Sequence, residues 1–255
     1  MRRAVGTGVL ALVSAVVSLP FYGGIYAKAQ GHSREKLSAY TTYFNENEGG
    51  RCANIRLSAS RIDGIALQPY GEFSFNAAVG KRTVENGYQT AKIIAEGEFV
   101  LGVGGGVCQV STTLYNAAIL AGLQATEVHA HSLSVGYVPL SRDAMVSSES
   151  DLRLYNPHAD TVYFSVQVSA GAVKATVYGK DEGYAYSIES KTLKILPPPE
   201  PIVEPGDKDE VTRYPKDGAE SESYLSTYRN GVLLSVKRLR KDRYAPLGAM
   251  MTKKA

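Results

Sequence analysis

The stretch Gly104-Gly105-Gly106-Val107-Cys108-Gln109-Val110-Ser111-Thr112-Thr113-Leu114-Tyr115-Asn116-Ala117-Ala118 joins a glycine run to a helical pattern, with a cysteine at the junction. From Gln109 to Leu123 the apolar residues recur at helical spacing and indicate one buried helix face. Gly122 lies near the end of this pattern. The sequence therefore predicts a helix that follows a glycine turn and carries Cys108 at its N-terminus.

A thiol at the start of a helix has a definite chemistry. The unpaired amides there carry about half a positive charge, which favours the thiolate and lowers the cysteine pKa. The glycines allow a substrate to approach the backbone, and the amides of Gly106, Val107 and Cys108 are placed to bind an oxyanion. A small buried cysteine at a turn is the alternative interpretation.

Two histidines follow the predicted helix. The stretch from Ala125 to His131 alternates in the manner of a strand, with His129 and His131 on one face. A cysteine beside a histidine is the usual arrangement of a cysteine nucleophile and its base. Spacing alone leaves open which of the two histidines is the base.

Four further side chains are candidate site residues because of their positions in the sequence. Asp143 is expected to orient a histidine or bind substrate, although Arg142 and Asp143 also fit a turn ion pair. Ser111 and Thr112 lie in the first turn of the helix, where they contact substrate or cap the helix.

The whole chain predicts an α+β fold, with a mixed or antiparallel sheet, a few helices and a small β-rich C-terminal extension. A second helix is expected from Asn54 to Ile65, and strands are expected at 38–44, 67–75, 91–95, 99–101, 152–155, 161–168 and 173–178. The main domain is assigned to 38–180, a stiff proline-rich linker to 181–201 and the extension to 202–255. Asn230-Gly231 predicts a hairpin turn in the extension, which is expected to pack on the main domain.

Several function classes are excluded by composition and motif. A net charge of +3 with scattered basic residues does not indicate nucleic-acid binding. The glycine run lacks the Gly-Lys-Ser/Thr of a phosphate loop and the spacing of a dinucleotide fingerprint. We expect no cofactor. Cys52 and Cys108 are too few for a metal site, but in an exported protein they could form a disulfide.

The N-terminus predicts export. Arg2 and Arg3 precede an apolar run from Val9 to Leu19, and Ala27-Lys28-Ala29 fits a cleavage site. Residues 1–29 are therefore either a cleaved signal peptide or a membrane anchor, and both place the protein outside the cytoplasmic membrane, at the cell surface or the cell wall.

The chain resembles the VanW family of exported or membrane-anchored bacterial proteins. The resemblance extends from about Ser38 to Gly179 and follows several separate motifs in order: Phe73-Ser74-Phe75-Asn76, Val79-Gly80-x-Arg82-Thr83, Gly87-Tyr88, the stretch from Gly104 to Ala118, Glu127-x-His129-x-His131-Ser132, Tyr137-Val138-Pro139 and Arg142-Asp143-Ala144. The family commonly has other residues at Val128, Ser134, Ser141 and Met145. The C-terminal tail loosely resembles a G5-like extension.

The resemblance implies a function. Some family members are understood to be cysteine L,D-transpeptidases that cross-link peptidoglycan, so Cys108 would be the nucleophile and peptidoglycan stem peptides the partners. A non-catalytic peptidoglycan-binding or glycopeptide-resistance accessory protein is the alternative. The catalytic candidates are Cys108, His131, His129 and Asp143, and the substrate-binding candidates are Gly105, Gly106, Gln109, Ser111, Thr112, Ser132, Tyr137 and Arg142.

Overall fold

The computed structural model describes residues 34–95 and 97–254. The expected signal or anchor at residues 1–29 lies outside these ranges. Within them the protein is β-rich, with fifteen strands and three helices in several mostly antiparallel sheets. The fraction of these residues in helices is smaller than the predicted α+β class implies, so that prediction is only partly confirmed. No helix in the described part of the chain is both long enough and apolar enough to cross a membrane.

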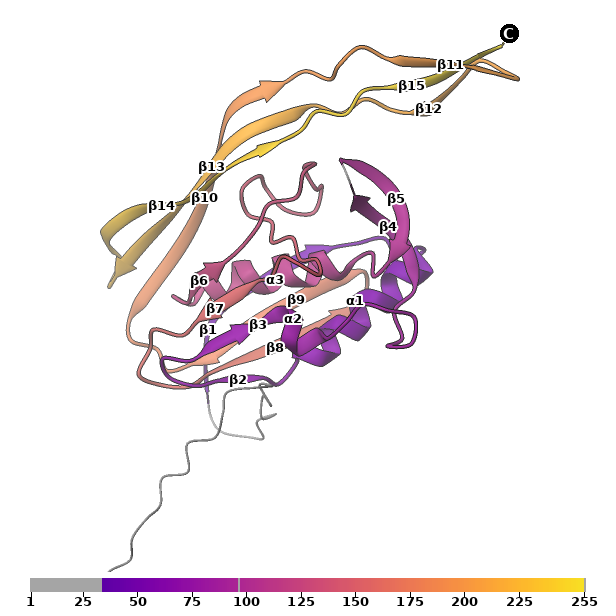
Figure 1. Ribbon diagram of the computed structural model, residues 1–255. Helices are drawn as coiled ribbons and strands as arrows, with labels where there is room; N and C mark the ends of the chain where they lie inside the picture. The colour runs from indigo at the N-terminus through magenta and orange to yellow at the C-terminus, as the bar shows by residue number, and fades with distance from the viewer. Residues whose placement is uncertain (1–33, 96, 255) are drawn as a thin grey trace, which may run out of the picture.

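The main domain is built on a four-stranded antiparallel sheet. Its order is β1 (Glu35–Tyr43), β9 (Ala172–Gly179), β8 (Val162–Ser169) and β2 (Ala66–Leu67). Helix α3 (Val107–Leu120) packs on β1 and β9, and α1 (Gly49–Ile62) packs on β8 and against α3, so both helices cover one face (Figure 1). The helix faces predicted from apolar spacing are the buried ones, because α1 buries Ile55, Ala59 and Ile62, and α3 buries Val110, Leu114, Ala117 and Ala118.

Two smaller sheets flank this core. The first has the order β3 (Glu72–Ser74), β7 (Arg153–Tyr155) and β6 (Gln124–Glu127), and the short helix α2 (Phe75–Val79) follows β3 directly. Phe73 joins it to the main sheet through an edge-on contact with Phe164, with the ring centroids 5.3 Å apart. The second is the hairpin of β4 (Thr90–Ala95) and β5 (Glu98–Val103), which leads into the start of α3.

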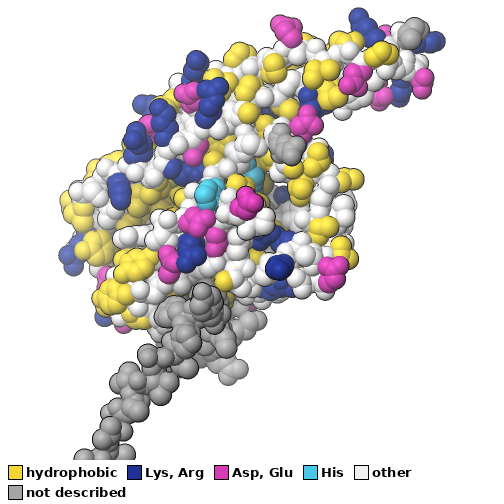
Figure 2. Space-filling model, viewed as in Figure 1, with side chains coloured by type: hydrophobic (Ala, Val, Ile, Leu, Met, Phe, Trp, Pro, Cys, Tyr) yellow, Lys and Arg dark blue, Asp and Glu magenta, His cyan; other side chains and the backbone are white. Residues whose placement is uncertain are grey.

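The C-terminal extension is a long β structure above the main domain (Figure 1). Strands β10 (Tyr184–Leu196), β13 (Gly218–Arg229) and β14 (Val232–Tyr244) form one sheet in that order. Strands β11 (Ile202–Gly206), β15 (Met250–Lys254) and β12 (Glu210–Arg213) form another. Asn230 and Gly231 have φ values of 51° and 79°, as the predicted hairpin turn requires. Lys and Arg side chains gather along β14 (Figure 2).

The prediction of a linker over 181–201 is wrong for most of its length. Residues 184–196 form β10, which pairs with β13 along that length. The prolines of this segment are confined to its end, from Pro197 onward, so they do not interrupt the ladder. The extension therefore begins soon after β9, and the amide of Ala245 donates to the carbonyl oxygen of Ser132 in the main domain at 2.7 Å.

Candidate active site

Cys108 lies in the first turn of α3, as the sequence predicts. Its sulfur is 3.5 Å from the Val146 amide nitrogen and 3.4 Å from the Val146 carbonyl oxygen. A thiolate accepts a hydrogen bond from the amide, whereas a thiol donates one to the carbonyl. Val146 therefore offers a partner to both protonation states of the sulfur.

The glycine run shapes the start of α3 by close packing. Gly106 precedes the helix at a φ of 105°, and a Cβ there would lie 3.0 Å from side-chain carbons of Arg51 and Ile55 on α1. A Cβ on Gly105 would lie 2.5 Å from the carbonyl oxygen of Lys92 on β4. The space left by the missing side chains is thus filled by protein, which differs from the expected open approach for substrate. Both glycines still line the cavity beside Cys108.

Some backbone amides at the start of α3 already donate a hydrogen bond within the protein, and others do not. The Val107 amide donates to the Gly104 carbonyl oxygen at 3.2 Å, so it is not free to bind an oxyanion. In the described part of the chain, the amides of Gly106 and Cys108 have no hydrogen-bond acceptor. These two remain candidates for the oxyanion site.

His131 joins the thiol to a carboxylate. Its Nδ1 donates to Asp143 Oδ2 at 2.6 Å, and its backbone amide donates to the same oxygen at 2.7 Å. The ring and the Cys108 thiol are also close enough for each group to shift the pKa of the other. Cys108, His131 and Asp143 therefore lie in sequence as a thiol, an imidazole and a carboxylate, with the hydrogen bond between the last two in place.

The electrostatics of these three groups favour a charged pair. Burial lowers the pKa of His131, but the bonds and charges of Asp143 and Cys108 outweigh it and raise that pKa to about 9. Burial raises the pKa of Cys108, but the bond to His131, its charge, the Val146 hydrogen bond and the charge of Arg82 together lower it below its ordinary value. Both shifts favour the thiolate–imidazolium form of the pair over the neutral form.

Asp143 is held by the C-terminal extension. The hydroxyl of Tyr244 on β14 donates to Asp143 Oδ1 at 2.5 Å, and Arg240 Nη1 donates to the Asp143 carbonyl oxygen at 2.6 Å. Burial raises the pKa of Asp143, but its bond to His131 and the contacts with Arg240 and Tyr244 outweigh this and lower it. Sequence reasoning missed Tyr244 and Arg240, because strand alternation does not reveal which distant loop a strand residue contacts.

His129 is not part of this arrangement. Its Nε2 lies 2.9 Å from Glu127 Oε1, and its carbonyl oxygen accepts the Met145 amide at 2.8 Å. The expected strand from Ala125 to His131 ends at Glu127, beyond which a single bridge to Met145 continues the pairing. Because the alternation stops, His129 and His131 do not share a strand face, and only His131 reaches the thiol.

Ser111 and Thr112 support the site from within the core. Ser111 Oγ donates to the Ala144 carbonyl oxygen at 2.6 Å, and the Ala144 amide donates to Thr112 Oγ1 at 2.9 Å. Both hydroxyls are buried and lie outside the cavity. They fix the segment next to Asp143, which differs from the two roles expected for them, substrate contact and helix capping.

The other substrate-binding candidates differ in placement. Tyr137 lines the cavity. Gln109 also lines it, but its amide nitrogen donates to Thr42 Oγ1 and its Oε1 accepts from Arg51. Ser132 is exposed and lies outside the cavity.

Arg142 lies away from the cavity. Its Nε donates to Asn116 Oδ1 at 2.8 Å, and its guanidinium carbon is 5.0 Å from the centroid of the Tyr40 ring. It forms no ion pair with Asp143, so the turn ion pair considered from the sequence is wrong. Asn116 takes its place as the partner of this side chain.

The two cysteines are not bridged. Both thiols are free. Cys52 is buried on α1, and its sulfur lies 3.3 Å from the carbonyl oxygen of Glu46. The disulfide considered from the sequence is therefore absent, and Cys108 is left as an unmodified thiol.

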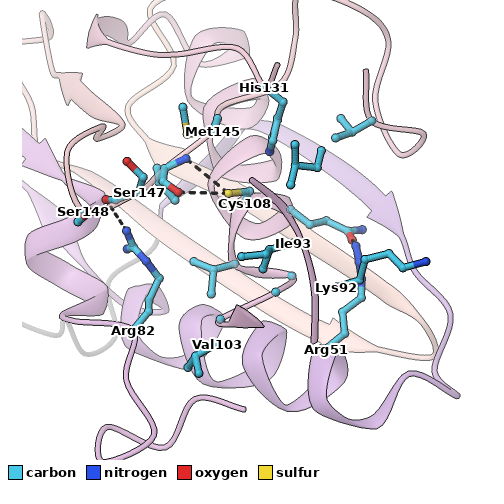
Figure 3. A pocket seen from close by; sticks show the side chains of 18 of the residues that line it. Arg51, Arg82, Lys92, Ile93, Val103, Cys108, His131, Met145, Ser147 and Ser148 are labelled. Atoms are coloured by element: carbon cyan, nitrogen blue, oxygen red, sulfur yellow. Dashed lines mark hydrogen bonds between the residues drawn. The ribbon is translucent and has the colours of Figure 1, made fainter. Parts of the chain in front are cut away.

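Cys108 opens into a cavity of about 870 Å³ between the β4–β5 hairpin and the segment that carries Met145 to Ser148. Figure 3 shows Arg82 with Ser147 and Ser148 on one side of Cys108, and Arg51 with Lys92 on the other. These cations were not predicted as site residues from the sequence, although Arg82 belongs to the motif Val79-Gly80-x-Arg82-Thr83. The cavity is large enough for a peptide segment.

The fold and the site define a class: a β-rich protein with a Cys–His–Asp arrangement at the start of a helix. Residues 50–178 match the family model described as VanW like protein, so the chain belongs to the VanW family. It is 42% identical over 171 residues to the uncharacterized protein YoaR of Bacillus subtilis (strain 168). The match covers 67% of this chain and 55% of that protein, so the chain spans about half the length of this relative.

Two solved structures are similar to part of the chain. One is described as an IgA1 protease G5 domain, with 17% identity, a TM-score of 0.21 and coverage of 28% of this chain and 89% of that domain. The other is described as HP0197-G5, with 15% identity, a TM-score of 0.17 and coverage of 28% and 96%. These scores are too low to support an argument about the fold of the extension.

Proposed function

We propose that this protein is an exported cysteine acyltransferase that acts on peptidoglycan stem peptides as an L,D-transpeptidase. The observation that carries the proposal is the His131–Asp143 hydrogen bond beside Cys108, with the thiol and the imidazole shifting each other's pKa. Membership in the VanW family supports a cell-wall protein related to vancomycin resistance. A cavity with several cations suits peptides that bear carboxylates.

The first half-reaction forms a thioester. The Cys108 thiolate attacks the carbonyl carbon of an amide between an L- and a D-centre. The amides of Gly106 and Cys108 stabilise the oxyanion. When the intermediate collapses, the C–N bond breaks, and His131 gives its proton to the leaving amine, so that a D-amino acid departs.

The second half-reaction reverses these roles. The side-chain amine of a second stem attacks the thioester carbonyl, and the now neutral His131 takes the proton from the attacking nitrogen. The C–S bond breaks and the thiolate is restored, which leaves a cross-link between the two stems. Water in place of the amine gives hydrolysis of the same thioester. Asp143 keeps its proton-free state and orients the His131 ring throughout.

The test is a comparison of cysteine variants on purified muropeptides. Cys108→Ala is expected to remove cross-linked product and D-amino acid release, because it removes the nucleophile. Cys52→Ala is the matched control, since it removes the other thiol, and it should retain both products. Mass spectrometry of the wild type quenched during turnover should show an acyl group on Cys108.

Equal product profiles for wild type and Cys108→Ala would contradict catalysis by this thiol. If the wild type released no product but bound the peptides, the result would favour the non-catalytic peptidoglycan-binding alternative. Omitting the acceptor stem separates transfer from hydrolysis, because only hydrolysis continues without it.

A further inference from the structure

Arg82 has a position that the catalytic groups do not explain. It belongs to the motif Val79-Gly80-Lys81-Arg82-Thr83, which follows α2 and lies well before Cys108 in the sequence. Its side chain lines the cavity on one side of Cys108 (Figure 3). Its charge is also one of the causes that lower the Cys108 pKa, so the guanidinium is near enough to act on the sulfur.

The guanidinium of Arg82 is fixed by neutral groups. Nη1 donates to Asn76 Oδ1 at 2.8 Å, and Nη2 donates to the Ser147 carbonyl oxygen at 2.5 Å. Its methylene carbons pack over Gly104, where a Cβ would lie 3.2 Å from Arg82 Cβ. A guanidinium has five N–H donors, so these two bonds leave three for a ligand.

The positive charge of Arg82 is also not neutralised by a neighbour. In the residues that the structure describes, no carboxylate forms an ion pair with it. Glu48 is the one described carboxylate that lines the cavity, and its Oε2 lies 3.5 Å from Arg51 Nε on the opposite side. Lys92 is exposed, so it lacks the fixed geometry of Arg82. Arg82 is thus a held and unpaired cation beside the nucleophile.

We propose that Arg82 binds the terminal carboxylate of the acyl donor, in the subsite for the D-amino acid that leaves. This inference rests on the proposed function. In a donor whose last amide is cut, the terminal carboxylate is the anion closest to the scissile bond, one Cα from the leaving nitrogen. A guanidinium with free donors matches such a carboxylate in shape and charge. The subsite therefore selects stems that end in a free D-residue over amides inside a longer chain.

The experiment compares two donors on each variant: a stem tetrapeptide with a free C-terminus and the same peptide with a C-terminal amide. For the wild type, kcat/KM for the free acid should exceed that for the amide by about 10- to 100-fold, the value of a charge-assisted hydrogen bond. In Arg82→Gln the ratio should fall to about 1. The ratio is the readout because loss of Arg82 also raises the Cys108 pKa and slows both donors alike.

Two further variants control the interpretation. Lys81→Gln removes the adjacent cation that lines the same cavity and should keep the wild-type ratio. Arg82→Lys keeps the charge without the planar fork and should keep part of the discrimination. Thermal unfolding of each variant establishes that the ratio is measured on folded protein.

A wild type that does not discriminate, or an Arg82→Gln variant that discriminates fully, would overturn the subsite. Titration of both peptides into Cys108→Ala and into Cys108→Ala/Arg82→Gln tests the subsite without turnover. If the wild type turns over neither donor, the proposed function fails, but tighter binding of the free acid that depends on Arg82 still supports the subsite. Equal binding of the two peptides, or binding of neither, overturns it.

Discussion

At Cys108, burial and hydrogen bonding act on the sulfur in opposite directions. Burial favours the neutral thiol, while His131, the Val146 contact and Arg82 favour the thiolate, and the net effect lowers the pKa. The same pairing raises the pKa of His131 to about 9. The reactive form, thiolate with imidazolium, is therefore populated between the lowered cysteine pKa and about pH 9.

The pH dependence of alkylation tests this pairing. In a Cys52→Ala background, the rate of Cys108 alkylation by iodoacetamide should rise with a midpoint below the free-thiol value of about 8.5. His131→Gln removes the imidazolium, so the midpoint should move up and the rate at pH 7 should fall by about 10-fold or more. Acyl transfer by the wild type should decline above about pH 9, as His131 loses the proton that it gives to the leaving amine. An unchanged midpoint in His131→Gln would show that the histidine does not control the thiol.

At the level of elements, the turn into α3 sets where the thiol lies. Gly106 combines a left-handed φ with close contact to α1, so two separate constraints exclude a side chain there. Gly136, in the loop that follows His131, has neither constraint, since a Cβ there would meet nothing within 4 Å. The backbone therefore requires glycine at position 106, whereas position 136 can accept a side chain.

Alanine substitution at these two glycines measures the difference. Gly106→Ala should lower the free energy of unfolding by about 2 kcal/mol through backbone strain and the approach to Arg51 and Ile55. It should also slow Cys108 alkylation, because the start of α3 must shift. Gly136→Ala is the matched control and should change the free energy of unfolding by less than about 0.5 kcal/mol. Both are measured by urea unfolding, and equal losses would argue against the close packing at Gly106.

Local patterns in the sequence predicted the elements that depend on local contacts. The Cys108 helix, the Asn230-Gly231 turn and the strands expected at 38–44, 161–168 and 173–178 follow from periodicity and turn chemistry, and all are present. The single strand expected at 67–75 is wrong, because β2 and β3 divide that stretch between two sheets. The end of β6 and the strand at 184–196 depend on distant pairing partners, which alternation alone does not reveal. Ser141 shows the same limit, because its φ of 58° lies in the left-handed region and only the backbone reveals it.

The residues of the candidate site could be predicted from local motifs, but their individual roles could not. Cys108 could be found from the glycine run and the helix, and His131 and Asp143 from their motifs. The choice between His129 and His131 could not, because it depends on where one short strand ends. The roles of Ser111 and Thr112 also depend on a tertiary neighbour, the backbone of Ala144.

On the scale of the whole molecule, the extension and the main domain share one hydrogen-bond network. Tyr244 Oη donates to Asp143 and accepts the amide of Ser141 at 2.7 Å, and Ser141 Oγ lies 2.6 Å from Ser221 Oγ on β13. These atoms are buried, so each lost bond has a cost of its own. The carboxylate that orients His131 is therefore held from both sides of this boundary.

Tyr244→Phe tests this connection with a change of one oxygen atom. The Tyr244 bond lowers the Asp143 pKa, so its loss should raise that pKa and move the acid limb of the activity profile to higher pH. We also expect the rate at the optimum to fall by about 10-fold, and the free energy of unfolding to fall by about 1–3 kcal/mol. Tyr224→Phe on β13 is the matched control, since that hydroxyl bonds Glu222 instead, and it should leave the acid limb unchanged. A loss of stability without a shift of the acid limb would reduce Tyr244 to a packing role.

The shared hydrogen-bond network also extends the structural unit of the site beyond the residues that match the family. Sequence similarity marks residues 50–178 as the recurring unit, yet Tyr244 and Arg240 lie more than sixty residues beyond its end. A chain cut at that border would retain its nucleophile and base but lose two groups that hold the carboxylate in place. A transfer of this domain into another protein would therefore have to include the C-terminal strands, because the family match ends before the residues that complete the site.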